Sequence, residues 1–301
     1  MLFSFLTASS TSFHTINGRT IYFIGFPSQV YSQTQFEFLP DGLNFLPLRA
    51  NNQEAKLGVL YYPENANLKV DIGNTMDLLS FQFPQSKSKL NLGIEFMAYA
   101  SVIGYGQLRL QIDAIDGFFG GNATFSKPLN DNLLSLRLRF IHNSAHLVDG
   151  NYWVHPYPRD WAKPGGPIPF TRDFAELVAA NTITVENYNL RYYGGFSFSA
   201  RIRPDNLKRV SALSGFEINS DKIIGKLFDK PVNIFLAHNI TYAGLPDYSF
   251  TNQSQLGVKF GSWESKGILF FFSFYSGNNM FSEYFDERIN KVGFGFAVDF
   301  P

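Results

Sequence analysis

The sequence has no cysteine, no long apolar run and no excess of charge of either sign. The absence of cysteine excludes disulfide bonds, thiolate metal ligands and cysteine nucleophiles. No stretch of about 18 apolar residues occurs, which excludes a conventional transmembrane helix. Basic and acidic residues number 25 each, so there is no basic surface for a phosphate backbone and we expect no nucleic-acid partner.

Aromatic residues, in contrast, are abundant. The 301 residues include 33 phenylalanines and 15 tyrosines, against four methionines. An ordinary globular core does not need so many aromatics, which favours a large apolar surface. Because no helix of this chain can cross a membrane, a membrane-spanning part has to consist of strands.

Apolar and polar residues alternate with a period of two, which is typical of strands with one dry face. The clearest example is the C-terminal segment, whose apolar positions are Val292, Phe294, Phe296, Val298 and Phe300. A soluble β-sandwich also has one dry face. Strands of about 10–14 residues with charges at mid-strand instead fit a wall between lipid and a wet lumen. We therefore predict an all-β fold, a transmembrane antiparallel up-and-down β-barrel.

We expect about 12 strands, within limits of 10 to 14. The predicted strands are 76–83, 90–102, 106–116, 118–127, 133–146, 169–180, 188–203, 209–219, 232–243, 250–260, 266–276 and 288–300, with a shorter hairpin at 55–62 and 67–73. With the C-terminus in the periplasm, the long connection 147–168 falls outside, as is usual for barrels of the bacterial outer membrane. The bacterial outer membrane is thus the expected location.

Residues 1–50 differ from the rest because they contain several prolines and no sustained alternation. We predict two parts, an N-terminal segment 1–50 and a barrel 51–301. The first residues, MLFSFLTASSTSFH, lack the basic start of a signal peptide and are expected to be a truncated or mis-started leader. The remainder of the segment is expected to plug the lumen or to lie as a periplasmic extension.

One predicted strand, 133–146, carries residues that suggest chemistry. The parity of its lipid-facing leucines continues to His142, Ser144 and His146. A histidine two residues before a serine on one strand shares its face, close enough for the imidazole to act as general base. Such a pair is also an ordinary polar feature at the height of the lipid headgroups.

This arrangement resembles the outer-membrane phospholipase A and lipid A deacylase barrels, which hydrolyse acyl esters with a His-x-Ser pair on a lipid-facing strand end. The resemblance implies Ser144 as nucleophile and His142 as base. Those enzymes place an Asn or Glu about a dozen residues after the serine, a distance that here falls within 147–168. The third member is therefore expected to be Glu176, with Asp173 second. We expect no cofactor, apart from calcium if the protein is a phospholipase.

A second resemblance runs from about residue 37 to the end of the chain. The segments concerned are FLPDGLNF, LGVLYY, RLRFIHNSAHLVDG, FTRDFAELVAA, LRYYGGF and FYSGNNMFSEYFDERINKVGFGF. In this order they resemble a family of bacterial proteins grouped by a domain of unknown function. Its members carry a His-x-Ser-x-His-Leu element followed by Asp, matched here by His142, Ser144, His146, Leu147 and Asp149. The resemblance implies an outer-membrane barrel and brings no activity.

Other polar residues are candidates for binding. Those for a substrate or rim site are His146, Asp149, Trp153 and Arg172. Those for the lumen lining are Arg109, Arg137, Arg139, Arg191 and Arg201. We expect no metal site, since His142, His146, Asp149 and His155 are equally explained as hydrogen-bonded rim residues.

Three functions remain open. The first is a porin-like barrel with a structural, partner-binding or limited transport role, because about twelve strands leave little room for a wide channel. The second is an acyl-ester hydrolase completed by close packing or by a homodimer. The third is a surface receptor that uses loops 147–168 and 277–287. Expected partners are outer-membrane lipids and, through the C-terminal strand with its terminal aromatic residue, the barrel-assembly machinery.

Overall fold

The computed structural model describes residues 11–16, 19–24, 34–105, 109–147 and 169–300. Strands β1 (Thr11–Ile16) and β2 (Arg19–Ile24) form a two-stranded sheet, and all later strands belong to a second sheet. No helix among the described residues is long and apolar enough to span a membrane.

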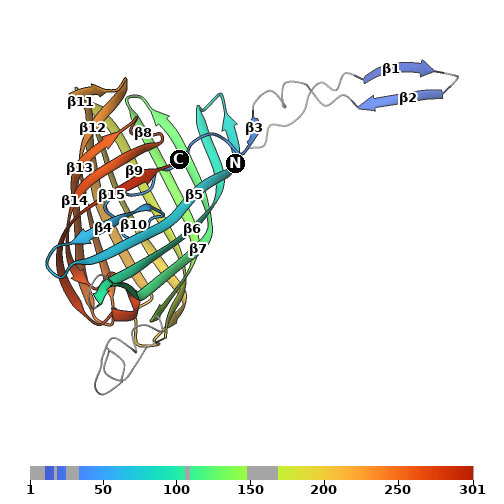
Figure 1. Ribbon diagram of the computed structural model, residues 1–301. Helices are drawn as coiled ribbons and strands as arrows, with labels where there is room; N and C mark the ends of the chain where they lie inside the picture. Colours follow the sequence, from blue (N-terminus) through green and yellow to red (C-terminus); the bar gives the residue numbers. More distant parts are fainter. Residues whose placement is uncertain (1–10, 17–18, 25–33, 106–108, 148–168, 301) are drawn as a thin grey trace.

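The second sheet closes into a barrel (Figure 1). Its wall consists of β4 (Leu57–Tyr62), β5 (Asn67–Phe83), β6 (Ser88–Tyr105), β7 (Arg109–Leu129), β8 (Asn132–Leu147), β9 (Phe170–Val185), β10 (Tyr188–Arg203), β11 (Val210–Leu227), β12 (Lys230–Gly244), β13 (Tyr248–Phe260), β14 (Gly267–Asn278) and β15 (Arg288–Asp299). Antiparallel pairing of β15 with β4, from Val298 opposite Leu57 to Phe294 opposite Tyr61, closes the ring. The prediction of an antiparallel barrel of about twelve strands is confirmed.

Two predicted strand boundaries are wrong. The segments 67–73 and 76–83 form the single strand β5, and the described part of 106–116, residues 109–116, belongs with 118–127 to β7. Register shifts in the pairing of β5 with β6 and of β6 with β7 mark β-bulges in these strands. A bulge reverses the inward and outward parity without ending the strand. The bulges do not coincide with the predicted breaks, where Asn74 pairs with Phe96 and Gly117 pairs with Ala98, so neither break is a turn.

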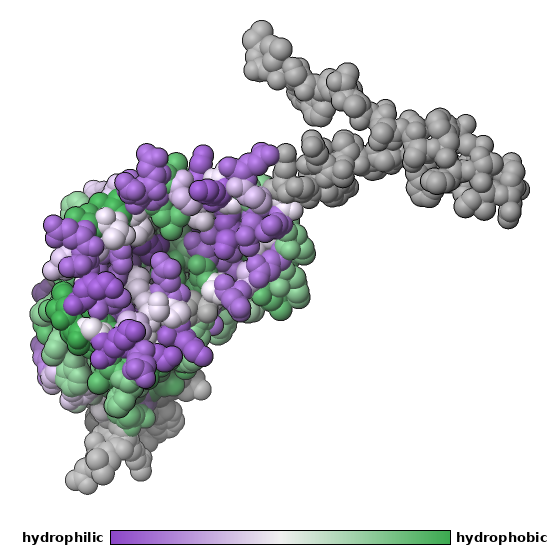
Figure 2. All heavy atoms as spheres, turned by 90° about the horizontal axis from the view of Figure 1, so that it is seen from above, coloured by the Kyte–Doolittle hydropathy of each residue, from purple (hydrophilic) through white to green (hydrophobic). Residues whose placement is uncertain are grey.

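The wall is apolar outside and polar inside. On β8, Leu138 and Phe140 are 36% and 61% exposed, whereas the intervening Arg137 and Arg139 are 5% and 1% exposed. Viewed along the barrel, hydrophilic residues gather over the end of the barrel and hydrophobic residues surround its sides (Figure 2). A closed barrel leaves no unpaired strand edge in its wall, as a bilayer requires.

The connections distinguish two ends of the barrel. The turns 84–87, 130–131, 186–187 and 228–229 lie at one end, together with Asp299, and we call this the turn end. The connections 204–209 and 279–287 lie at the other, the loop end, together with the strand ends Leu147 and Phe170. Short β3 (Gln35–Phe38) pairs with the part of β5 nearest the turn end.

Residues 39–56, which we call the plug, enter the lumen from the turn end. Phe45 and Leu48 are 5% and 0% exposed and pack with Val178, Ala180 and Tyr193 of the wall. The wall thus begins at Leu57 and not at residue 51. The plug occupies the interior that the strands would otherwise leave open.

Residues 279–287, which we call the lid, fold into the lumen from the loop end. They include the 3-10 turn η1 (Ser282–Tyr284). Met280 and Phe281 are 7% and 8% exposed, and the hydroxyl of Tyr99 donates to the Met280 carbonyl at 2.8 Å. In this connection, which the receptor hypothesis would use, Met280 to Glu283 and Phe285 are buried, whereas Asp286 and Glu287 are exposed.

Candidate functional site

A buried charge cluster joins the plug to the wall. Arg137 donates two hydrogen bonds to the carboxylate of Glu54, at 2.7 and 2.5 Å. Arg139 donates to Glu176 at 2.8 Å and to the carbonyl of Gln53 at 2.9 Å. Glu54 is 1% exposed, so this bidentate pair is out of contact with bulk water.

The charge state of Glu54 follows from its partners. Burial opposes ionisation and alone would raise its pKa, but attraction by Arg137 and Arg139 and the hydrogen bonds from Arg137 outweigh burial and lower the pKa from 4.5 to about 2. Glu54 is therefore a carboxylate at neutral pH. Glu95 adds a third carboxyl group to the cluster, 3.5 Å from Arg139.

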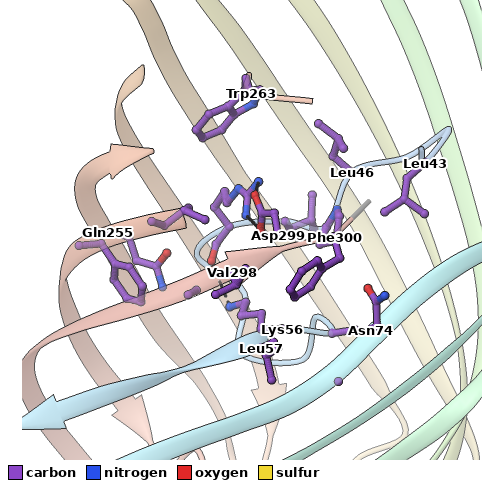
Figure 3. Close-up of a pocket in the computed structure, with 18 residues that line it drawn as sticks. Leu43, Leu46, Lys56, Leu57, Asn74, Gln255, Trp263, Val298, Asp299 and Phe300 are labelled. Atoms are coloured by element: carbon purple, nitrogen blue, oxygen red, sulfur yellow. Dashed lines mark hydrogen bonds and ion pairs between the residues drawn. The ribbon is translucent and has the colours of Figure 1, made fainter. Parts of the chain in front are cut away.

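A second set of contacts holds the plug nearer the turn end. Arg49 donates to both carboxylate oxygens of Asp299 at 2.7 and 2.6 Å, and Glu217 accepts from the Arg49 backbone at 2.7 Å. Lys56 donates to the carbonyl of Asn51 at 2.6 Å. Burial, only partly offset by nearby acids, lowers the pKa of Lys56 to about 8. Figure 3 shows Lys56, Asp299 and Trp263 around the pocket beside these contacts.

Hydrogen bonds also fix the first turn of the plug. Asn44 donates through its backbone to Asp77 at 2.8 Å, and its side-chain oxygen accepts from Ser126 at 2.6 Å. Arg191 donates to the Leu46 carbonyl at 2.9 Å. The plug is thus attached to β5, β7 and β10 as well as to β8 and β15.

The plug divides the interior into two spaces. A vestibule of about 610 Å³ opens at the turn end, bordered by Asn44, Phe45 and Arg191. A smaller chamber of about 90 Å³ lies between the plug and the lid, where Asn51 and Gln53 face Met280 and Ser282. The plug lies between these two spaces.

The outer surface carries the predicted reactive strand end. His142, Ser144 and His146 lie on the outward face of β8, opposite in parity to the buried Ala145. The Nδ1 atom of His142 is 2.6 Å from an oxygen of Asp173, its cross-strand partner on β9. Among the described residues no hydrogen bond joins His142 to Ser144. Gly117, across from Ser144 on β7, leaves the serine without a neighbouring side chain there.

Two predicted positions are corrected. Glu176, expected behind His142, points into the lumen because the even-numbered residues of β9 face inward, and Asp173 takes that place. Arg201, expected in the lumen, is outward and 86% exposed because a bulge between Ser199 and Arg201 reverses the parity of β10. Its guanidinium lies 3.9 Å from Asp173.

The remaining candidates are distributed between wall, lumen and loop. Arg137, Arg139 and Arg191 line the lumen, and Arg172 faces it from β9. Asp149 and Trp153 lie outside the described residues, as does the side chain of Arg109. Within the described part of the chain no cluster of histidine and acidic side chains could hold a metal ion.

Two features were not predicted from the sequence. The acids Glu54, Glu217 and Asp299, which hold the plug, belong to no local motif. A second outward histidine, His238 on β12, lies 2.8 Å from the hydroxyl of Ser254 on β13. The pair is invisible as a motif because its members lie on different strands, and only the register brings them together.

Comparisons with known proteins extend the description. Residues 29–300 match the family model described as "Protein of unknown function (DUF1207)". No curated protein matches the sequence. Among solved structures, in-vitro folded OmpT in trimer form, an outer membrane protein of Vibrio cholerae, is similar with 9% identity and a TM-score of 0.34, covering 88% of this chain and 98% of that chain. Outer-membrane expressed OmpT of Vibrio cholerae has 10% identity and a TM-score of 0.33, covering 84% and 99%.

The fold and the lumen together define the class of this protein, a closed twelve-stranded antiparallel barrel filled by its own N-terminal segment. The family model spans nearly the whole chain, so the protein belongs to the DUF1207 family. The predicted resemblance to a family of unknown function is confirmed, whereas that to the phospholipase barrels stays a prediction.

Proposed function

We propose that this protein is an outer-membrane barrel that admits small polar solutes when its plug leaves the lumen. The observation that carries the proposal is the attachment of the plug through the buried Arg137–Glu54 pair and, nearer the turn end, through the Arg49–Asp299 pair. Such pairs stabilise the closed state and can be opened by changing one charge.

The outer wall supports a membrane location. Large apolar side chains on the outward face are widely exposed, among them Phe196 at 58% and Phe272 at 58%. Full exposure of so many aromatics to water would be unfavourable, whereas lipid accommodates them. In this setting lipids surround the wall, and the barrel-assembly machinery is the expected partner of β15.

The interior supports passage limited to small solutes. The inward residues are polar or charged, as in barrels with a wet lumen. Once the plug is out, buried arginines and acids such as Arg137, Glu176 and Glu217 would line the path. A twelve-stranded barrel is narrower than the 16-stranded and 18-stranded general porins, so we expect passage of solutes the size of a monosaccharide.

A covalent bond between plug and wall tests the proposal. The chain has no cysteine, so the variant Asn44→Cys/Ser126→Cys carries its only two thiols on side chains that touch in the closed barrel. We expect a short cleavable cross-linker to join them at neutral pH. The cross-linked barrel should then admit arabinose no faster than protein-free liposomes at pH 3, and cleavage should restore uptake.

The matched control is Asn44→Cys/Phe125→Cys. Phe125 directly precedes Ser126 on β7 and lies on the outward side of the wall, where the same linker cannot reach position 44. Equal cross-linking of the two variants would contradict a plug inside the lumen. If the rate of arabinose uptake were the same with and without the cross-link, passage through the lumen would be contradicted.

A second function is favoured by the geometry of His142. Asp173 orients the imidazole through Nδ1, which leaves Nε2 to accept a proton, as a general base requires. Ser144, two residues along the same outward face, is the candidate nucleophile for an acyl ester of a membrane lipid. Rotation of the serine or the imidazole has to bring them into contact.

We expect any hydrolysis of phospholipid or lipid A by the refolded barrel to disappear in Ser144→Ala and in His142→Ala. Asp173→Asn should lower the rate at least tenfold, because the imidazole loses its acidic partner. His238→Ala is the control, since His238 lies on the distant strand β12. Rates measured in mixed micelles with and without calcium decide the matter. Turnover that survives Ser144→Ala would contradict a serine mechanism.

A further inference from the structure

Arg172 differs from the other described arginines of the lumen because it forms no ion pair with an acid among the described residues. Within the described part of the chain, Arg137, Arg139 and Arg191 each form an ion pair, and no carboxylate oxygen lies within 4 Å of Arg172. Arg172 is nevertheless 9% exposed. A buried guanidinium without a paired anion is unfavourable, and such groups are normally compensated.

The contacts of Arg172 with described residues fix the direction of its side chain but do not use its two terminal nitrogens. Its Nε donates to the side-chain oxygen of Asn143 at 3.2 Å, and its guanidinium carbon lies 4.6 Å from the ring centre of Phe174. Among the described residues, neither terminal nitrogen donates a hydrogen bond to the protein. Two parallel N–H donors are thereby left for a ligand.

These donors border the chamber between the plug and the lid. Its volume of about 90 Å³ is several times the roughly 10–15 Å³ that one water molecule needs, so it can hold a small ion with some water. Hydroxyl groups of Ser197, Ser211 and Thr241 lie on the same lining. Ser197 and Ser211 are hydrogen-bonded to each other at 2.6 Å, so one hydroxyl of this pair and that of Thr241 remain as uncharged donors.

The two acids near the chamber, Asp116 and Glu176, form no ion pair with Arg172. Asp116 accepts from Asn143 and from the backbone of Ser282 in the lid, and both of its oxygens are thereby engaged. Glu176 also borders the chamber, but its carboxylate is bound by Arg137 and Arg139. The free positive charge facing the chamber belongs to Arg172.

We propose that the chamber is a binding site for a small oxyanion, a carboxylate or a phosphate, held by the two terminal nitrogens of Arg172. Guanidinium and oxyanion match in planar geometry and form bidentate hydrogen bonds. The inference builds on the proposed function, because it names the class of solute that the closed barrel retains. It places that solute between the plug and the lid.

Equilibrium dialysis of the full folded chain in detergent, with labelled acetate and labelled inorganic phosphate, tests this site. We expect saturable binding of one ion per chain for at least one of the two probes, below roughly 10 mM. Binding of acetate alone assigns a carboxylate, and binding of phosphate alone assigns a phosphate. Absence of saturable binding for both probes, with the heat-modifiable folded band intact, would overturn the proposal.

Variants locate the ion. Arg172→Gln should weaken binding at least tenfold, and Arg172→Lys, which keeps the charge without the fork, should weaken it several-fold. If the glutamine variant does not fold, the lysine variant decides. The control is Arg203→Gln, an exposed arginine of β10 whose cross-strand partner Thr171 is the neighbour of Arg172. Equal affinity in wild type and both Arg172 variants would refute the site.

Dialysis involves no transport, which separates the two proposals. Binding that depends on Arg172 in a barrel that never admits solute would leave the anion site standing and remove the proposed function. Uptake controlled by the plug in a barrel that binds neither probe would do the reverse.

Discussion

Arg139→Met is expected to destabilise the folded barrel by about 3–5 kcal/mol, the usual range when one partner of a buried ion pair is removed. Arg139 is 1% exposed and contacts Glu176 at 2.8 Å and Glu95 at 3.5 Å. Methionine fills much of the volume but leaves these carboxyl groups facing one remaining guanidinium, that of Arg137. Unfolding in urea is followed by the heat-modifiable gel band of the folded barrel. The shift in the midpoint of this transition measures the loss of stability.

The double variant Arg139→Met/Glu176→Gln should recover a large part of this loss, because it removes one of the stranded charges. Arg203→Met, a change of the same type at an exposed position, should alter stability by less than about 0.5 kcal/mol. If the free energy of unfolding of the single variant Arg139→Met were within about 1 kcal/mol of the wild-type value, the charge cluster would not stabilise the barrel.

The alternation of residues predicted the wall because each strand separates lipid from a polar interior. On β8 it placed Arg137 and Arg139 inward and His142 outward, as the structure has them. It failed for Arg201, since the β-bulge before this residue reverses the parity and leaves no mark in composition.

The orientation of β9 was not predictable from apolar residues alone. By period two Glu176 shares a face of its strand with Phe174 and Val178, and such apolar neighbours are compatible with contact with lipid. Both residues face inward, because the lumen is filled and they pack within it, Val178 against the plug. Inward apolar residues therefore indicate contact with the plug or the lid. Alternation with period two cannot distinguish such residues from residues that face lipid.

The course of the plug was equally beyond local pattern. Its conformation depends on contacts with residues far along the chain, as between Arg49 and Asp299 or between Glu54 and Arg137. An irregular segment has no periodicity of its own. The partners of its side chains are brought together only in the closed wall, so they cannot be predicted from the segment alone. The lack of alternation in residues 1–50 indicated a segment outside the wall and no more.

Acid is expected to release the plug. Glu54 has a pKa of about 2 in the closed barrel, against an ordinary value of 4.5 that it regains in water. A lowered carboxyl pKa stabilises the closed state above pH 4.5, and this contribution is lost as the pH falls from 4.5 towards 2. At about 1.4 kcal/mol per pH unit the difference between 4.5 and about 2 corresponds to roughly 3.5 kcal/mol, about three-hundredfold in the ratio of open to closed barrels once Glu54 is fully protonated, and to about thirtyfold at pH 3.

Arabinose uptake by proteoliposomes between pH 7 and pH 3 is the most direct test of a barrel closed by Glu54. Wild type should be nearly closed at pH 7 and open progressively below pH 4.5, whereas Glu54→Gln should be open at pH 7 and change little. Glu64→Gln, at an exposed ion pair with Lys291 at the loop end, should follow wild type. Equal uptake by wild type and Glu54→Gln at pH 7, or a wild-type rate unchanged down to pH 3, would contradict closure of the lumen by this carboxylate.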